Sequence, residues 1–191
     1  MAKAYVDPYR EDYINLEDVK LQRDWSRFGG AVNARGYTEY YMHIALDDDS
    51  IAQFLTDNGY PVKIWVKKND PEGAPEKHMK IFLPYNDDPK KAWLTPIIKL
   101  FYVNGSGEGV TITRDNVGML DSCLVDHANV TLRKFNGRTP LGQEYVHAQL
   151  VYAEFYVSGQ RQSRTDYVPS YAVRQDAPVE AGQSPNEELP F

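Results

Sequence analysis

Short runs rich in Tyr, Val, Ile and Phe recur along the chain and are separated by Gly, Pro, Asn and Asp. Branched and aromatic side chains suit the pleated surface of a strand, and the separating residues suit turns. This spacing is typical of an all-β barrel or sandwich. It predicts strands near residues 16–23, 37–46, 61–68, 77–84, 97–103, 110–114, 124–135 and 145–157.

Helical spacing is confined to short segments. Ile51, Phe54 and Leu55 recur at the i, i+3 and i+4 positions of a helix, acidic residues precede them, and Asn58-Gly59 follows. Acidic residues suit the start of a helix, and a glycine suits its end. The pattern predicts one helix over 49–58 and a further helical turn over 116–121.

The two ends of the chain differ from its body. With 191 residues, 42% of them hydrophobic, the chain is long enough for one domain with its own core. Residues 1–18 and 176–191 carry net charges of −3 and −4, which leaves about +1 for residues 19–175 out of a total of −6. From residue 175 onward Pro, Glu, Gln, Gly and Ser dominate, and such a segment buries too little apolar surface to offset its ordering entropy. We expect a domain over 1–158 with an acidic extension over 1–15, and a flexible acidic tail over 159–191.

Alternation divides the strands on either side of residues 69–76 into two faces. An apolar set alternates with a basic and aromatic set. The apolar set is Val62, Ile64, Val66, Met79, Ile81 and Leu83, and the other set is Lys63, Trp65, Lys67, His78, Lys80 and Phe82. Exposed rings beside ammonium groups suit unpaired nucleotides, because bases stack on the rings and phosphates meet the cations.

The alternative is that Trp65 and Phe82 are buried and the lysines are ordinary surface charges. A similar surface is expected around Trp25, which lies among Arg23, Arg27 and Phe28, and at Tyr37 and Tyr41 on one face of the next strand. The alternative for these residues is a β-hairpin packed by aromatic side chains. Over 97–114, Lys99 and Phe101 alternate with Ile98, Leu100 and Tyr102, and here we favour the core. Trp93, beside Lys90 and Lys91, is either a stacking arm or a lid over the core.

No motif indicates an enzyme, and we expect no catalytic residues, no metal site and no cofactor. The segment Gly105-Ser106-Gly107-Glu108-Gly109 lacks the Gly-Lys-Ser/Thr of a phosphate loop, so it suits a hairpin turn. The histidines, His43, His78, His127 and His147, have no paired-ligand spacing and suggest surface or satisfied core groups. Asp47 to Asp49 are explained by a helix start.

The composition also indicates the compartment. Cys123 is the single cysteine, the residues after Met1 contain no apolar run typical of a signal sequence, and no stretch approaches the length of a membrane span. These features predict a reducing cytoplasm and no membrane partner.

The last residues form a short acidic segment that closes on Leu-Pro-Phe and the carboxylate. A partner pocket can take the terminal ring and clamp the carboxylate with a basic residue. The segment resembles the acidic Pro-Phe tip of bacterial and phage single-stranded-DNA-binding proteins. In that family the tip recruits replication, recombination and repair proteins, and the resemblance implies that role for Glu187, Glu188, Leu189, Pro190 and Phe191.

Further blocks resemble phage-encoded single-stranded-DNA-binding proteins with OB-like folds. They are Ile51 to Val66, Val117-Gly118-Met119-Leu120-Asp121, Val130 to Phe135 and Tyr145-Val146-His147-Ala148. The resemblance implies an OB-like β-barrel with added strands, one or two short helices and a disordered C-terminal tail. It also implies a host-cell cytoplasmic location.

The hypothesis from the sequence is that the barrel coats single-stranded DNA without sequence specificity during phage DNA replication, recombination and repair. The alternative is a protein-interaction or virion β-domain that does not bind nucleic acid, which the near-neutral body permits; annealing of complementary strands would use the same surface. The sequence leaves open whether the protein forms a homo-oligomer. The candidate DNA-binding residues are Arg23, Trp25, Arg27, Arg35, Tyr41, Lys63, Trp65, Lys67, Lys80 and Phe82.

Overall fold

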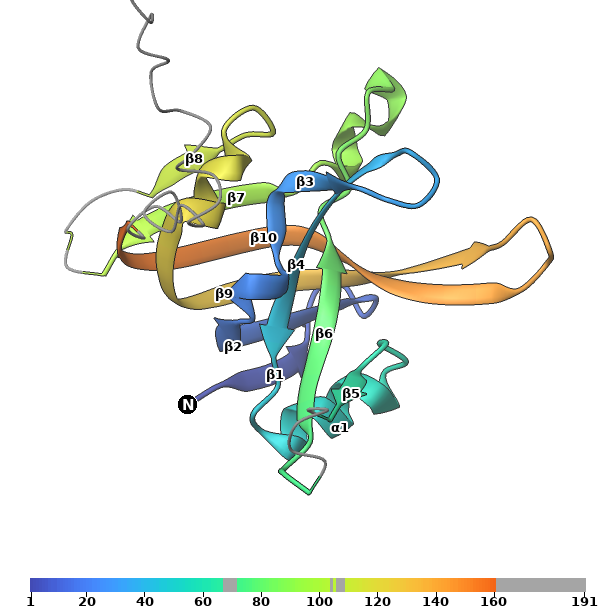
Figure 1. Ribbon diagram of the computed structural model, residues 1–191, viewed down its shortest axis with the longest axis horizontal. Helices are drawn as coiled ribbons and strands as arrows, with labels where there is room; N and C mark the ends of the chain where they lie inside the picture. Colours follow the sequence, from blue (N-terminus) through green and yellow to red (C-terminus); the bar gives the residue numbers. More distant parts are fainter. Residues whose placement is uncertain (67–71, 104, 106–108, 161–191) are drawn as a thin grey trace, which may run out of the picture. The chain divides into compact units, whose positions relative to one another are not determined.

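The computed structural model describes residues 1–66, 72–103, 105 and 109–160. Strands dominate it, with one α-helix and three short 3₁₀ turns among these residues (Figure 1). The elements are β1 (Lys3–Val6), β2 (Tyr13–Leu21), η1 (Arg23–Trp25), β3 (Arg27–Val32), β4 (Thr38–Ala45), α1 (Asp49–Asp57), β5 (Lys63–Trp65), β6 (Glu76–Phe82), η2 (Pro89–Leu94), β7 (Ile97–Tyr102), β8 (Val110–Ile112), η3 (Val117–Ser122), β9 (Cys123–Arg138) and β10 (Glu144–Gln160).

A ring of strands forms the centre of the fold. The order is β6-β4-β2-β9-β10, and β10 returns to β6 through a short parallel pairing of Ala148 with Ile81 and Gln149 with Phe82. The other pairings in the ring are antiparallel. A five-stranded, partly open barrel of this kind is the architecture of the OB fold. The expected OB-like barrel is therefore confirmed.

The remaining strands extend this barrel at its edges. Strand β5 pairs with β6, β3 with β4 and β1 with β2, while β7 pairs in parallel with the second half of β10 and carries β8 on its other edge. Strand β1 was not expected from the sequence, whereas β3 forms with β4 the β-hairpin that was the alternative for the segment around Trp25. Strand β1 lies within the acidic extension assigned to residues 1–15, where it pairs with β2.

The core fills the inside of the barrel because alternate side chains of each strand point there. Met42 and Ile44 of β4, Met79 and Ile81 of β6 and Leu132 of β9 are fully buried. On β7, Ile98 and Leu100 are buried, as the sequence predicts, whereas Tyr102 is exposed.

The predicted helix is confirmed as α1. The Asp48 carboxylate accepts a hydrogen bond of 2.8 Å from the Ser50 amide at its start, and Gly59 follows its end with a φ of 74°, which glycine adopts at little cost. The helix buries Ile51 and Leu55. The turn expected over 116–121 is the 3₁₀ helix η3.

One prediction about β5 is wrong. The alternation places Ile64 and Val66 on an apolar, inward face, but these residues are 64% and 44% exposed. The reason is that β5 is a three-residue edge strand, paired with β6 on one side only, and it extends past the part of the sheet that covers the core.

The end of the β9–β10 hairpin projects beyond the barrel (Figure 1). We call this part, residues 135–147, the arm. Its ladder is continuous with the barrel, from the Arg138–Glu144 pair near the turn to the Leu132–Leu150 pair in the core. The arm is therefore a direct extension of two barrel strands.

Contacts divide the chain into Met1–Arg161 and Gln162–Phe191, and the second unit lies outside the described residues. The division into a domain and a tail at residue 158 thus stays a prediction. Within the described residues, none of the helices has the length and apolar character needed to cross a membrane.

Candidate nucleic-acid interface

Aromatic side chains form a continuous row on the outer side of the barrel. We call this row the ring face, and it comprises Trp25, Tyr41, His43, Trp65, His78, Phe82, Phe135, Tyr145 and His147. Trp25 of η1 contacts Trp65 and His78 edge-on, with ring centroids 5.3 and 4.8 Å apart. The row therefore begins where η1 lies over β5 and β6.

The middle of the ring face crosses the β4–β6 strand pair. Tyr41 is registered against Phe82, with ring centroids 6.4 Å apart. Phe82 in turn lies 4.6 Å from His147 of β10, across the parallel closure of the barrel. This contact joins the barrel part of the row to the arm.

The row ends on the arm. Phe135 is stacked on His147 at 4.8 Å and 14°, and Tyr145 lies 5.7 Å from His147. Phe135 and Tyr145 are 41% and 42% exposed. The Tyr145 ring packs against Gly137, where an added β-carbon would lie 2.4 Å from Cζ of the tyrosine. The Tyr145 ring can occupy this position because residue 137 is a glycine and has no side chain.

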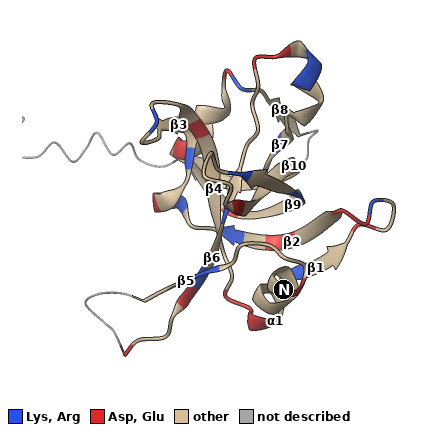
Figure 2. Ribbon diagram, turned by 90° about the vertical axis from the view of Figure 1, so that its right-hand side faces the viewer, with Lys and Arg blue, Asp and Glu red and all other residues tan. Residues whose placement is uncertain are grey.

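Cations accompany the rings. The Lys80 ammonium lies 3.8 Å from the centroid of Tyr41 and 4.3 Å from that of Phe82, and 3.5 Å from a carboxylate oxygen of Glu39. Lys63 is exposed on the neighbouring β5. Figure 2 shows basic residues along β5 and β6, with one acidic position at the start of β6, which is Glu76, and further acidic residues around the start of α1. The sheet thus presents positive charge beside exposed rings.

A groove of about 590 Å³ lies between the barrel and the arm. It is lined by the turn between β3 and β4, the start of β4, the end of β6 with the residues that follow it, and strands β9 and β10. Its rings and cations include Arg35, Tyr40, Phe82, Tyr85, Arg138, Tyr145 and His147. Arg138 is already paired with Glu144 at 2.6 Å, so its charge is partly neutralised.

Three histidines, His43, His78 and His147, belong to the ring face. The sequence had suggested that they are separate surface or core groups, so their shared position was not predicted. Burial lowers the pKa of His43 from its ordinary value near 6.5 to about 4, and the nearby His78 and Lys80 add to the shift. Burial also lowers the pKa of His78 and of His147. These imidazoles are therefore neutral rings at pH 7. The local signal was alternation, since each lies two residues from another ring or cation of the same face.

Most of the predicted DNA-binding residues gather on this side of the molecule. Trp25, Tyr41, Lys63, Trp65, Lys80 and Phe82 lie in or beside the ring face, Arg27 is registered against Tyr41, and Arg35 lines the groove. Trp65 is 38% exposed and Phe82 is half-buried, so neither ring is sealed in the core. Lys67 and the tip residues Glu187, Glu188, Leu189, Pro190 and Phe191 lie outside the described residues.

Two predicted residues make contacts that differ from the expected ones. Arg23 donates a hydrogen bond to the backbone carbonyl of Cys123, at the start of β9. The Arg27 guanidinium donates to the carbonyls of Asp24 and Ser26, at 2.8 and 2.6 Å. Both arginines therefore also support the local backbone.

A further basic residue near the groove, Arg133, was not among those predicted from the sequence. Arg133 donates from Nε to Gln149 at 3.0 Å, and its guanidinium lies 5.1 Å from the centroid of Trp93, which is 72% exposed. Gln149 in turn contacts His147 at 3.3 Å. Trp93 is thus an exposed ring on a cation and does not cover the core.

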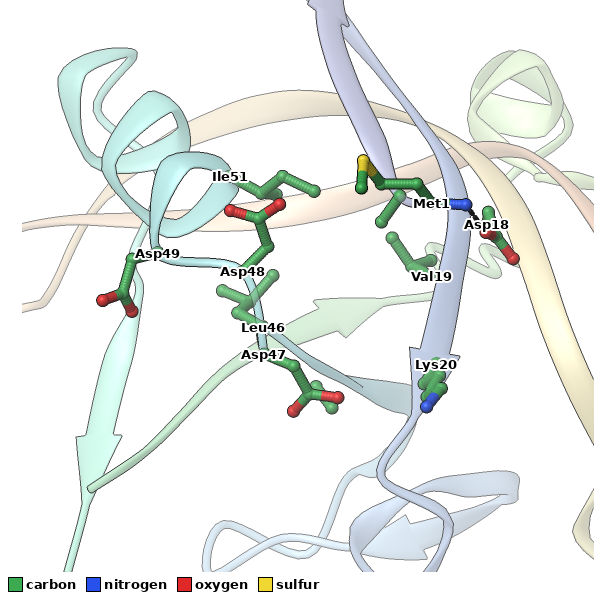
Figure 3. A pocket seen from close by; sticks show the side chains of 11 residues that line it. Met1, Asp18, Val19, Lys20, Leu46, Asp47, Asp48, Asp49 and Ile51 are labelled. Carbon is green, nitrogen blue, oxygen red and sulfur yellow. Dashed lines mark hydrogen bonds and ion pairs between the residues drawn. The ribbon is translucent and has the colours of Figure 1, made fainter. Parts of the chain in front are cut away.

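A second hollow, of about 570 Å³, lies between β2 and the start of α1. Figure 3 shows Asp18, Asp47, Asp48 and Asp49 around it. These carboxylates repel phosphate, so this hollow is unfavourable for a polyanion. In the described part of the chain, no group of three or more His, Cys, Asp or Glu residues is placed to hold a metal ion.

No protein-family model and no curated protein sequence matches the chain. Among solved structures, a C-terminal truncation of the single-stranded DNA-binding protein from bacteriophage Enc34 is similar, with a TM-score of 0.47 and 10% identity over 83% of this chain and 91% of that chain. The Enc34 protein in complex with ssDNA gives a TM-score of 0.46 and 10% identity over 81% and 91%. The single-stranded DNA binding protein gp2.5 encoded by bacteriophage T7 gives 0.34 and 8% over 96% and 100%. These similar structures are phage single-stranded-DNA-binding proteins, the group that the sequence motifs resemble.

Proposed function

We propose that this protein binds single-stranded DNA without sequence readout, through the ring face and the cations beside it. The observation that carries the proposal is Lys80, whose ammonium lies within 4.3 Å of two ring centroids on the open side of the sheet. A base that stacks on either ring takes the place of the ammonium over that ring and leaves it beside the nucleotide, within reach of a phosphate. The same cluster of side chains can therefore bind both a base and a phosphate of one nucleotide chain.

The rings favour single strands over duplexes. A base in a duplex already stacks on its neighbours, whereas an unpaired base offers its flat side to an aromatic ring. Stacking contributes roughly 1–3 kcal/mol per base and tolerates any sequence, because every base has such a side. Trp65, Phe135 and Tyr145 are exposed enough to take part directly.

The cations beside the ring face predict a dependence on salt. Each phosphate that one of them neutralises contributes about −0.7 to the slope of log affinity against log salt for a single strand. A β-domain that does not bind nucleic acid gives no such slope.

The direct test replaces two rings, Trp65→Ala with Phe82→Ala. We expect affinity for poly-dT to fall by roughly tenfold or more for each stacked base that is lost. Tyr9→Ala is the matched control, since Tyr9 is 94% exposed in the turn between β1 and β2. Equal affinity of the double variant and the control, at fixed salt, would rule out the ring face. Tryptophan fluorescence during titration with single-stranded and duplex DNA checks the preference for single strands.

We also propose that the protein coats DNA during phage replication, recombination and repair, and recruits enzymes through Glu187 to Phe191. The support is the acidic sequence ending in Leu-Pro-Phe, which suits a pocket with a basic clamp. Deleting residues 186–191 should abolish capture of replication or repair enzymes and leave DNA affinity intact or slightly raised. A marked loss of DNA affinity on that deletion contradicts this division of roles.

A further inference from the structure

The segment that carries Trp25 is attached to β4 through the buried hydroxyl of Ser26. Ser26 is 3% exposed, and its Oγ donates to the Gln22 carbonyl at 3.0 Å and accepts from the His43 amide at 3.0 Å. Gln22 and His43 are also joined through their backbones at 2.8 Å. The start of η1 is thus fixed to β4.

A carboxylate from a distant part of the chain holds the other side. Asp121 of η3 accepts from the Phe28 amide at 3.0 Å with Oδ1 and from the Gly29 amide at 2.8 Å with Oδ2. Gly118 of the same turn lies against Gly29, and a β-carbon on Gly118 would be 3.2 Å from its Cα. Bonds to an ionised acceptor are stronger than neutral ones.

Arg23 completes the anchorage. Its guanidinium donates to the Cys123 carbonyl, directly after η3, so the segment 23–29 is attached to η3 and β9 at both of its ends. Trp25 lies between these attachments, with its indole edge-on to Trp65 and His78. The side chains that make these anchoring bonds, those of Ser26, Asp121 and Arg23, are not part of the ring face, and His43, which is, contributes only its backbone.

We propose that Asp121 and Arg23 are positioning residues that hold Trp25 ready to stack on a base, and that Arg23 is not a phosphate ligand. This inference rests on the proposed binding of single-stranded DNA. A segment fixed before binding does not lose its conformational freedom when the strand arrives, so affinity rises without any added contact.

The sign of the effect separates positioning from simple electrostatics. Asp121 is negative, and removing a negative charge near a phosphate-binding surface strengthens binding if charge alone matters. If Asp121 positions Trp25, its removal weakens binding. Asp121→Asn is therefore informative, because it removes the charge and one of the two acceptors at nearly constant volume. Asp115→Asn, at an exposed position ahead of η3, is the matched charge control.

The test is a double-mutant cycle with Trp25→Ala, read by poly-dT affinity. We expect Asp121→Asn to weaken binding about tenfold in the wild-type background and by less than about twofold in the Trp25→Ala background. Asp115→Asn should leave affinity unchanged or slightly raised. An equal loss from Asp121→Asn in both backgrounds, or no loss in either, overturns the proposal.

A second measurement does not depend on DNA. In a variant with Trp65→Phe and Trp93→Phe, Trp25 is the only tryptophan. Its fluorescence anisotropy without ligand should fall on Asp121→Asn and on Gly118→Ala, which separates η3 from β3 without changing charge. Unchanged anisotropy in both variants rejects the positioning role. If the wild-type protein fails to bind any single strand, the proposed function fails, while this measurement still decides the anchorage.

The role of Arg23 is tested separately, by the salt dependence of DNA affinity. Loss of a phosphate ligand lowers the steepness of the salt slope by about 0.7, whereas loss of a positioning residue lowers affinity at an unchanged slope. We expect Arg23→Gln to show an unchanged slope and Lys63→Gln to show the smaller one. A shallower slope for Arg23→Gln identifies it as a phosphate ligand and overturns that part of the proposal.

Discussion

His43 and His78 lie side by side on the β4–β6 strand pair, with ring centroids 5.4 Å apart, and Trp25 contacts both imidazoles edge-on. Their surroundings are mainly basic. Protonation of His43 is disfavoured by burial and, in addition, by the nearby cations Lys80, Lys63 and Arg27. A nearby carboxylate has the opposite effect at the other two histidines: Glu76 favours protonation of His78, and Glu39 favours that of His147. The pair therefore acts as neutral packing beneath the indole.

Stability should fall as the pH drops from about 6.5 toward 4. The pKa of His43 is lowered to about 4 in the folded protein, so the unfolded chain binds more protons in this interval and is favoured there. His43→Phe should lose less stability than the wild type when thermal unfolding is compared at pH 7 and pH 4.5. An equal pH dependence in the two proteins argues against burial of a neutral His43.

Replacing Lys80 should weaken binding more than replacing a lysine elsewhere. Lys80→Gln removes the ammonium between Tyr41 and Phe82, so poly-dT affinity should fall and the salt slope should flatten by about 0.7. Lys3→Gln on β1 is the control, with a side chain 71% exposed. If both variants bind alike in a salt titration, Lys80 does not meet a phosphate.

Glu39→Gln should strengthen binding. The carboxylate lies 3.5 Å from the Lys80 ammonium and competes with an incoming phosphate for it. An amide at this position removes that competition and can still accept from Asn33, which donates to Oε1 at 2.8 Å. We expect an increase of about two- to threefold in poly-dT affinity at low salt, shrinking as salt rises. Weaker binding of Glu39→Gln contradicts the competition.

Gly137→Ala should impair binding of long strands only. The new methyl group displaces the Tyr145 ring on the arm, and it leaves the barrel part of the ring face unchanged. Affinity should therefore fall for oligonucleotides long enough to reach the arm, as with Tyr145→Ala, and stay constant for the shortest ones that bind. Gly159→Ala is the control, because among the described residues a β-carbon there meets only Leu124, at 3.8 Å. A uniform loss at every length points to a folding defect instead.

Local alternation was sufficient to predict much of this face. Met79 and Ile81 are buried while Lys80 and Phe82 remain partly exposed, because a strand with one buried side has a period of two residues. The same reasoning was wrong for Ile64, because alternation does not tell a short edge strand from one that covers the core.

Long-range pairings could not be predicted. His147 meets Phe82 only because β10 closes the barrel onto β6, and Asp121 meets Phe28 only because η3 lies against β3. Neither contact leaves a mark in the residues around it. Alternation could assign His147 to a face of its own strand but not bring it to Phe82, and the residues around Arg23 gave no reason to expect its bond to the Cys123 carbonyl.

Strands β9 and β10 run without interruption from the core of the barrel into the arm. Tyr145 is thus joined to Leu150 by a few residues of paired backbone, and its separation from Trp25 is built into the barrel itself. The arm is therefore a continuation of the barrel strands and not a separate, loosely attached segment. A single strand that binds to both ends, as proposed, has to adjust its own spacing to the protein and loses conformational freedom when it does so.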